Sequence, residues 1–426
     1  MLTTLIFHNS PLEEIEAYLQ NDNVEINEVD ANGFTPLTLA VNNGDRPLTK
    51  SLLKYGAKID GRKRTIHGFC SDVDGYTPLM IAIKNKDHQM VNLLINDDAN
   101  VNKRIDEAHG EGMTVLILAC LTDESKIIKL LLDCYADMGE TYDNMTPLII
   151  SCKYGLLEAV NMLLEQGVSV HQDDNCGQNP VFSVLISSEP IRIDILHLLL
   201  KYHPRLSRNT CKGEVTSLHY LAQHTHDISK ERFKTILEAT RLLVASGANI
   251  DQSCYSINYS PLLTAVHHNA RPEFIQLLIN LEANINRGDS EGKTALMLAA
   301  ECGYEPLVKL LVEAGANVNK LNYHKRTALT YAIKSGNLEI VKMILKAGAD
   351  PNVIFPIKKN LELTKILLEG GAKIDFFYEP LDEKTRTKLV NCSKELVTLL
   401  QENGLEIDRI RDNKVQRVFL IQFSSI

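Results

Sequence analysis

The chain has no tryptophan, and aromatic residues make up only 6% of it. This scarcity disfavours functions that need many rings, such as aromatic-lined catalytic clefts or platforms for stacked bases. Basic residues do not dominate either, since 45 Lys and Arg accompany 54 Asp and Glu and the net charge is −9. Nucleic-acid binding needs clustered positive charge, and the densest basic cluster is the short run Arg62–Arg64. We therefore expect no nucleic-acid partner.

Long apolar runs and cysteine motifs are also missing. Without a stretch of about 18 apolar residues, no membrane insertion is expected. Residues Met1 to Pro11 lack the basic region and apolar core of a secretory signal. The nine cysteines are too few for a disulfide scaffold and contain no Cys-x-x-Cys spacing. Because Cys120, Cys152 and Cys302 lie in apolar segments, we predict free thiols and a cytoplasmic location.

The 426 residues, of which 44% are hydrophobic and 23% charged, instead carry a repeated pattern. The segments Gly292–Gly303 and Lys325–Gly336 align without gaps at an offset of 33 residues. An apolar stretch and a Gly-Ala turn follow each of them. Self-similarity at a fixed period indicates a repeat architecture. The same frame begins at Thr35, Thr77, Thr146 and Ser260, each followed by Pro-Leu, and in weaker form at Thr114, Asn179 and Thr216.

Each repeat predicts a pair of short helices. The Thr or Ser side chain accepts a hydrogen bond from a free amide as N-cap, and proline in the first helical position sacrifices no hydrogen bond. The second helix carries apolar residues three and four positions apart, as at Val308 and Leu311, which is the spacing of one buried face. It ends at Gly315, in a position that favours a positive φ.

Turns of the Gly315 type can be aligned along nearly the whole chain. They lie at Asn23, Gly56, Asp98, Tyr135, Gly167, His203, Gly247, Glu282, Gly315, Gly348, Gly371 and Gly404. The long intervals, from Gly56 to Asp98 and from His203 to Gly247, predict insertions. The short interval before Gly371 predicts a truncated repeat, because two prolines in Asp350–Ile357 disfavour a first helix.

This frame resembles the ankyrin repeat family, whose motif reads G-x-T-P-L-x-x-A, then a Val/Leu-rich helix, then G-A-x-x-N. The resemblance implies an all-α solenoid of about 11–12 repeats, some degenerate, each with two short helices and a β-hairpin finger loop. It also implies a module or scaffold that binds protein partners through a concave groove of finger loops and first helices. We expect a monomer that is not an enzyme and that holds no cofactor or metal.

The predicted organisation has three parts. The ankyrin repeat array spans residues 1–349, with an N-terminal cap repeat at 1–29 and insertions near 60–73 and 223–236. Residues 350–408 are expected to form truncated and degenerate repeats. Residues 409–426 lose the pattern, and we expect a C-terminal cap or tail there.

Two positions vary freely in the ankyrin pattern, around the fingertip glycine and after the inner Ala pair. Here they carry aromatic, methionine and basic side chains, which are typical of interface hot spots. The alternative is that a ring before Thr-Pro-Leu packs on the neighbouring finger. The net charge favours a basic partner. The predicted partner-binding residues are Phe34, Tyr76, Tyr142, Met145, Tyr154, Tyr259, His267, His268, Lys293, Arg326 and Lys334.

An alternative hypothesis places chemistry in the insertions. Ankyrin chains with uneven repeats resemble effectors that intracellular bacteria or viruses deliver into the cytosol or nucleus of a host cell. An insertion would then hold a cysteine-hydrolase-like site, in which a thiolate lies near a histidine. His67, Cys70 and Asp72 form one such neighbourhood, and Cys211 with His219 forms another.

Histidine and cysteine also suggest a metal site, with the candidate ligands His219, His224, His226, Cys211 and Cys254. Their spacings do not match a zinc ligand set, so we predict structural roles. His219 stands in the Leu-His position of the ankyrin motif, where the ring hydrogen-bonds the finger backbone.

Three asparagines raise the question of modification. Asn102, Asn286 and Asn319 each follow a leucine by eight residues. With this spacing they resemble substrates of the asparaginyl hydroxylase of animal cells. The alternative is that these side chains bridge backbone groups of the turn.

Overall fold

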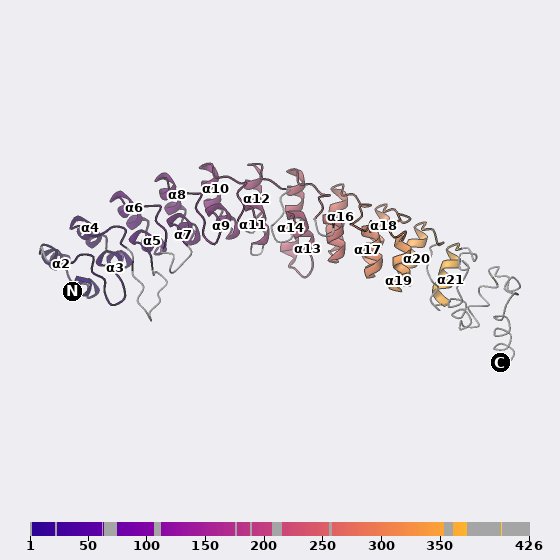
Figure 1. Cartoon of the computed structure of the whole chain (residues 1–426), viewed down its shortest axis with the longest axis horizontal. Helices are drawn as coiled ribbons and strands as arrows, with labels where there is room; N and C mark the ends of the chain where they lie inside the picture. The colour runs from indigo at the N-terminus through magenta and orange to yellow at the C-terminus, as the bar shows by residue number, and fades with distance from the viewer. Residues whose placement is uncertain are drawn as a thin grey trace, which may run out of the picture. The chain divides into compact units, whose positions relative to one another are not determined.

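A computed structural model gives the structure of the chain (Figure 1). It describes residues 2–21, 24–61, 63, 75–105, 112–174, 177–187, 190–206, 215–254, 258–352, 361–372 and 402. The chain divides into two compact units. Unit 1 comprises Met1–Gly213 and Lys230–Gly247, and unit 2 comprises Glu214–Ser229 and Ala248–Ile426.

Both units consist of short paired helices. Unit 1 contains α1 (Leu2–Phe7), α2 (Leu12–Leu19), α3 (Pro36–Asn42), α4 (Arg46–Lys54), α5 (Pro78–Lys84), α6 (His88–Asn96), α7 (Val115–Thr122), α8 (Ser125–Asp133), α9 (Pro147–Lys153), α10 (Leu157–Glu165), α11 (Pro180–Ile186), α12 (Ile193–Leu200) and α14 (Lys230–Ala245). Unit 2 contains α13 (Ser217–Gln223), α15 (Pro261–His267), α16 (Pro272–Asn280), α17 (Ala295–Cys302), α18 (Glu305–Glu313), α19 (Ala328–Ser335), α20 (Leu338–Lys346) and α21 (Leu361–Glu369). Extended pairing in the described residues is confined to isolated bridges in the finger loops, such as Tyr142 with Met145.

The helices of each unit form two layers, which Figure 1 shows. In unit 1 the first helices α3, α5, α7, α9 and α11 pack on one another in succession, and so do the second helices α6, α8, α10, α12 and α14. In unit 2 the first helices are α13, α15, α17 and α19, and the second helices are α16, α18, α20 and α21. Each unit is therefore an all-α repeat solenoid, as the sequence predicts.

The predicted N-caps of the first helices are confirmed. Thr35 Oγ1 accepts the amide of Thr38 at 3.1 Å, and Ser260 Oγ accepts that of Leu263 at 3.3 Å. The equivalent caps are Thr77, Thr114, Thr146, Asn179, Thr216, Thr294 and Thr327. Proline occupies the first helical position after five of these caps, at Pro36, Pro78, Pro147, Pro180 and Pro261. The repeated cap position, with or without the proline, thus marks the start of these first helices.

The predicted turns after the second helices are confirmed wherever they are described. All ten described positions have a positive φ, from 51° at His203 to 95° at Gly247. An Asp, Tyr, His or Glu occupies four of them, although a side chain with a Cβ is strained in this conformation. The backbone geometry therefore persists where glycine is replaced, as at Tyr135, whose side chain is 90% exposed.

Asparagine and aspartate side chains link successive repeats. Asn286 Oδ1 accepts the amide N–H of Asn317 at 2.8 Å, and Asn319 Oδ1 accepts that of Asp350 at 2.7 Å. The same bond joins Asn27 to Lys58, Asp60 to Asn100, Asn102 to Asp137 and Asp251 to Asn284. Each such bond satisfies a backbone donor of the next repeat, so the turn of one repeat positions the turn of its neighbour.

The insertion predicted near 223–236 is largely helical. Residues 224–229 connect α13 to α14, and α14 begins at Lys230 and has 16 residues. The described second helices elsewhere have eight or nine residues, so the added residues lengthen α14 at its N-terminal end. Phe233 and Ile236 in this extension are buried. Most of the insertion near 60–73, most of 350–408 (all but 350–352, 361–372 and 402) and all of 409–426 lie outside the described residues.

A helix that crosses a membrane needs about 20 apolar residues. Among the described residues, no helix combines that length with sufficient hydropathy.

The positive-φ turns predict opposite effects of two substitutions. Gly315→Ala places a Cβ at a φ of 83° in open space, so the backbone strain alone should lower the free energy of unfolding by about 1–2 kcal/mol. Tyr135→Gly relieves the same strain at a φ of 58° and should maintain or raise stability. Urea unfolding followed by circular dichroism checks both, and a stable Gly315→Ala variant would contradict the prediction.

Candidate functional site

The predicted partner-binding residues lie on the fingers and at the C-terminal ends of the first helices. Unit 1 holds Phe34, Tyr76, Tyr142, Met145 and Tyr154, and unit 2 holds Tyr259, His267, His268, Lys293, Arg326 and Lys334. Because the first helices of each unit pack side by side, these residues share one layer within their own unit. The exposed fractions of these side chains differ strongly. They distinguish side chains that pack on the protein from those that a partner can contact.

The two aromatic residues at the N-terminal fingers pack against lysines of the chain. Lys63 Nζ lies 4.8 Å from the ring centroid of Phe34, and Lys84 Nζ lies 5.8 Å from that of Tyr76. Both rings are half-buried. Cation–π contacts of this kind hold neighbouring elements together. Phe34 and Tyr76 therefore combine the two roles that the sequence suggests, partner binding and packing within the protein. Each ring packs on a lysine and leaves only part of its surface to solvent.

The finger before α9 is a tight hairpin. Tyr142 and Met145 exchange backbone hydrogen bonds of 3.0 and 2.9 Å across Asp143 and Asn144, which both have a positive φ. This is the conformation of a two-residue hairpin turn. The half-buried Tyr142 and Met145 flank it, and Tyr154, at the end of α9, is 58% exposed. Tyr154 thus offers a large amphipathic ring to solvent.

Unit 2 carries a cluster of aromatic and imidazole rings. The ring centroids of Tyr259 and His267 are 5.5 Å apart, and those of His267 and His268 are 5.2 Å apart. Burial, His267 and His224 lower the pKa of His268. Burial and the nearby Asp289 raise the pKa of Tyr259. Both shifts favour uncharged rings at neutral pH, so this surface suits apolar or aromatic contacts.

His219 has the structural role that the sequence predicts. Its Nε2 donates to the carbonyl oxygen of Tyr259 at 2.9 Å, and its Nδ1 accepts from the hydroxyl of Thr216 at 2.8 Å. Burial lowers the pKa of His219 although the Tyr259 carbonyl opposes the shift. The ring therefore stays neutral and ties the start of α13 to the finger before α15.

Lys293 and Lys334 share one carboxylate. Lys293 Nζ lies 2.9 Å from Glu301, and Lys334 Nζ lies 3.6 Å from it. Burial lowers the pKa of Lys293, but the hydrogen bond and charge of Glu301 outweigh burial and raise it. The Lys293 ammonium also lies 4.9 Å from the ring centroid of Tyr331. Lys293 is thus engaged inside the protein, whereas Lys334 and Arg326 are exposed.

Sequence reasoning missed two exposed residues in the last described finger. Leu321 is 57% exposed and Tyr323 is 78% exposed. Ala31 and Ser290 occupy the place of Tyr323 in two other fingers. A large ring where these fingers carry small residues is the signal that could have found Tyr323.

The three candidate hydroxylation sites act as acceptors in the turns. Asn102, Asn286 and Asn319 each accept a backbone amide of the next repeat. Asn319 also donates through Nδ2 to the carbonyl oxygen of Gly348 at 3.0 Å. The geometry therefore agrees with the bridging alternative, and modification of these side chains stays a prediction.

The residues of the cysteine-hydrolase alternative fall mainly outside the described residues. These are His67, Cys70, Asp72 and Cys211. Among the described thiols, burial raises the pKa of Cys120 to about 12, and burial also raises that of Cys152 and Cys302. The described parts of the chain contain no group of three or more His, Cys, Asp or Glu that could hold a metal ion.

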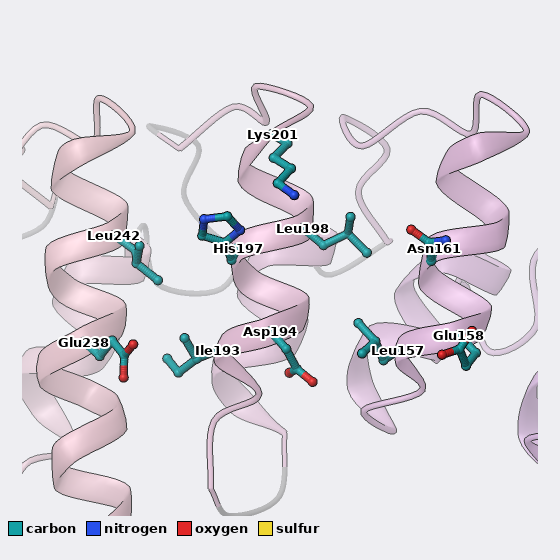
Figure 2. Close-up of a pocket in the computed structure, with 10 residues that line it drawn as sticks. All are labelled: Leu157, Glu158, Asn161, Ile193, Asp194, His197, Leu198, Lys201, Glu238 and Leu242. Atoms are coloured by element: carbon teal, nitrogen blue, oxygen red, sulfur yellow. The ribbon is translucent and has the colours of Figure 1, made fainter.

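A hollow of about 560 Å³ lies on the other layer of unit 1 (Figure 2). The second helices α10, α12 and α14 line it. Figure 2 shows Glu158, Asp194 and Glu238 near one end and Lys201 near the other. Asp194 is already paired with Arg192 at 2.6 Å. The hollow therefore combines leucine side chains with charges of both signs, and it is separate from the predicted finger surface.

Comparison with known proteins identifies the repeat. A family model described as ankyrin repeats (3 copies) matches residues 6–105, 100–174, 231–322 and 262–355. These matches cover more than half of the chain. A search of curated proteins found no significant match.

The buried ring of His219 leads to a prediction about stability and pH. His219→Ala leaves the Tyr259 carbonyl and the Thr216 hydroxyl without their partner and should cost about 1–3 kcal/mol. Because the pKa of His219 is lowered in the folded state, acidification below about 6.5 protonates the unfolded chain first and lowers stability. The variant should lose this part of the pH dependence.

Urea midpoints between pH 8 and pH 5 measure the effect, with the exposed His88→Ala as control. A His219→Ala variant with the stability and pH profile of the control would contradict the structural role.

Proposed function

The chain belongs to the ankyrin repeat family, and we propose that it binds a partner protein through its finger loops and first helices. Ankyrin repeats are generic protein–protein interaction modules, and the family is typically non-enzymatic. The observation that carries the proposal is that each unit exposes ring and basic side chains on its own first-helix layer. Tyr154 represents it in unit 1, and His267, His268 and Arg326 represent it in unit 2.

The chemistry of these side chains supports binding. Tyrosine and arginine are enriched among residues that dominate interface energetics, since they combine large contact area with directed hydrogen bonds. The fingers are held by buried caps and by side chains such as Asp30, which accepts the amides of Asn32 and Phe34 at 2.8 Å. A rigid support lowers the entropy that binding must overcome. The proposed contact surface is therefore ordered before a partner arrives.

We place this function in the cytoplasm and in a monomer. The alternative suggested by the sequence is delivery into a host cell. It concerns the location of the protein, and the same surface would bind the partner there.

Substitution on the first-helix layer tests the proposal. The variant Tyr154→Ala/His267→Ala/Arg326→Ala removes three exposed side chains and should weaken capture of the partner at least tenfold. Affinity capture from the cell of origin, quantified by mass spectrometry, measures the loss. The matched control is Lys129→Ala/Glu158→Ala/Lys309→Ala on exposed positions of second helices.

Urea unfolding of both variants verifies that they fold. If the first-helix variant retains every partner that the control retains, the proposed contact surface is wrong.

A further inference from the structure

The finger Lys320–Arg326 of unit 2, hereafter the basic finger, exposes apolar side chains on a fixed backbone. Leu321 is 57% exposed and Tyr323 is 78% exposed. The Tyr323 amide donates to the carbonyl oxygen of Glu291 at 2.9 Å. Its ring lies over Gly292, where a Cβ would come within 3.3 Å of it. Tyr323 is therefore exposed and yet held against the neighbouring finger.

The basic finger also presents cationic side chains. Lys325 and Arg326 are exposed, and so is the neighbouring His324 ring. The buried Asn322 side chain holds the fingertip, because its Oδ1 accepts the amides of His324 and Arg326 at 3.0 and 2.8 Å. Lys293 and Lys334 have Glu301 as a partner, whereas within the described residues Lys325 and Arg326 form no ion pair.

Lys325 stands where the turn itself favours glycine. Its φ is 57°, and the equivalent fingertip positions are Gly33, Gly75, Gly112, Gly177 and Gly292, all with positive φ. Two further fingers carry Asn144 and Asn258 there, and asparagine tolerates this conformation well. A lysine does not, so the requirements of the fold do not explain Lys325.

We propose that the basic finger docks an acidic peptide segment of the partner, in which carboxylates flank one apolar side chain. The carboxylates would pair with Lys325 and Arg326, and the arginine fork can bind a carboxylate with two hydrogen bonds. The apolar side chain would cover Tyr323 and Leu321. This inference rests on the proposed function, and it replaces the basic partner that the net charge of −9 favours.

The surroundings favour a peptide over a nucleic acid. A phosphate backbone needs a continuous track of positive charge. Glu291 is exposed in the adjacent finger, and Glu301 neutralises the next two lysines. Among the described fingers and first helices of these neighbouring repeats, the exposed positive charge without an ion pair therefore lies on the basic finger, and its extent suits one or two carboxylates.

Selection of phage-displayed random dodecapeptides on the full chain tests the proposal. Enriched sequences should hold two or more acidic residues around a Leu, Phe or Ile. Fluorescence anisotropy of the synthetic consensus peptide should show a Kd at least tenfold weaker for Lys325→Glu/Arg326→Glu. The matched control Lys309→Glu/Lys342→Glu, on α18 and α20, should bind like the parent chain. Raising the salt concentration should also weaken binding.

Lys325→Gly separates binding from folding. It relieves the backbone strain of the positive φ and should raise the urea midpoint. It also removes a cation and should weaken binding of the peptide several-fold. Gain of stability together with loss of affinity is the result that a purely structural role of Lys325 does not give.

The proposal is overturned if no acidic sequence is enriched, or if the double charge reversal leaves the Kd unchanged. It is also overturned if a labelled 20-nucleotide oligothymidine binds through Lys325 and Arg326 while acidic peptides do not. If Tyr154→Ala or His267→Ala weakens binding of the enriched peptides and the basic-finger variants do not, this inference fails and the proposed function stands. If none of these substitutions weakens peptide binding, both fail.

Discussion

A single constraint governs the molecule: none of its short helices is stable alone. The first helices have seven or eight residues between Pro36 and Ser335, which is too short for a persistent helix in water. They exist because each repeat buries its apolar side on the next, as Leu79–Ile83 do with an exposed fraction of 0–1%. Neighbour contacts then supply the stability of each repeat. Caps, turns and the asparagine bridges all serve to keep adjacent repeats in register.

The same constraint frees the outer surfaces. Once the inner side of a repeat is devoted to packing, the fingertip and the helix ends can vary in chemistry without loss of the core. Unit 2 uses this freedom asymmetrically. Its basic finger carries Lys325 and Arg326 without an ion pair in the described residues, while on its second helices Lys309 and Lys342 are paired with Glu313 and Glu339. A net charge of −9 averages over these layers, and it is a poor guide to the charge that a partner meets.

Function in such a protein is a matter of which side chains the scaffold leaves accessible. Phe34 and Lys293 have hot-spot chemistry, but Lys63 covers the first ring and Glu301 pairs with the second side chain. Tyr154 and Tyr323, by contrast, remain largely exposed. Residue type alone therefore selects candidates, and the contacts around each candidate decide its role.

The repeat, the caps and the turns could all be predicted from the sequence, because these depend on local chemistry. A Thr or Ser side chain reaches an amide three residues away, and a positive φ follows the second helix even at Tyr135 and His203. The sequence did not determine exposure, because exposure depends on neighbours that are distant in the chain. Only the tertiary structure placed Tyr323 over Gly292, left Arg326 without an ion pair in the described residues, and extended α14 into the insertion. These outcomes depend on packing between repeats, which no local pattern encodes.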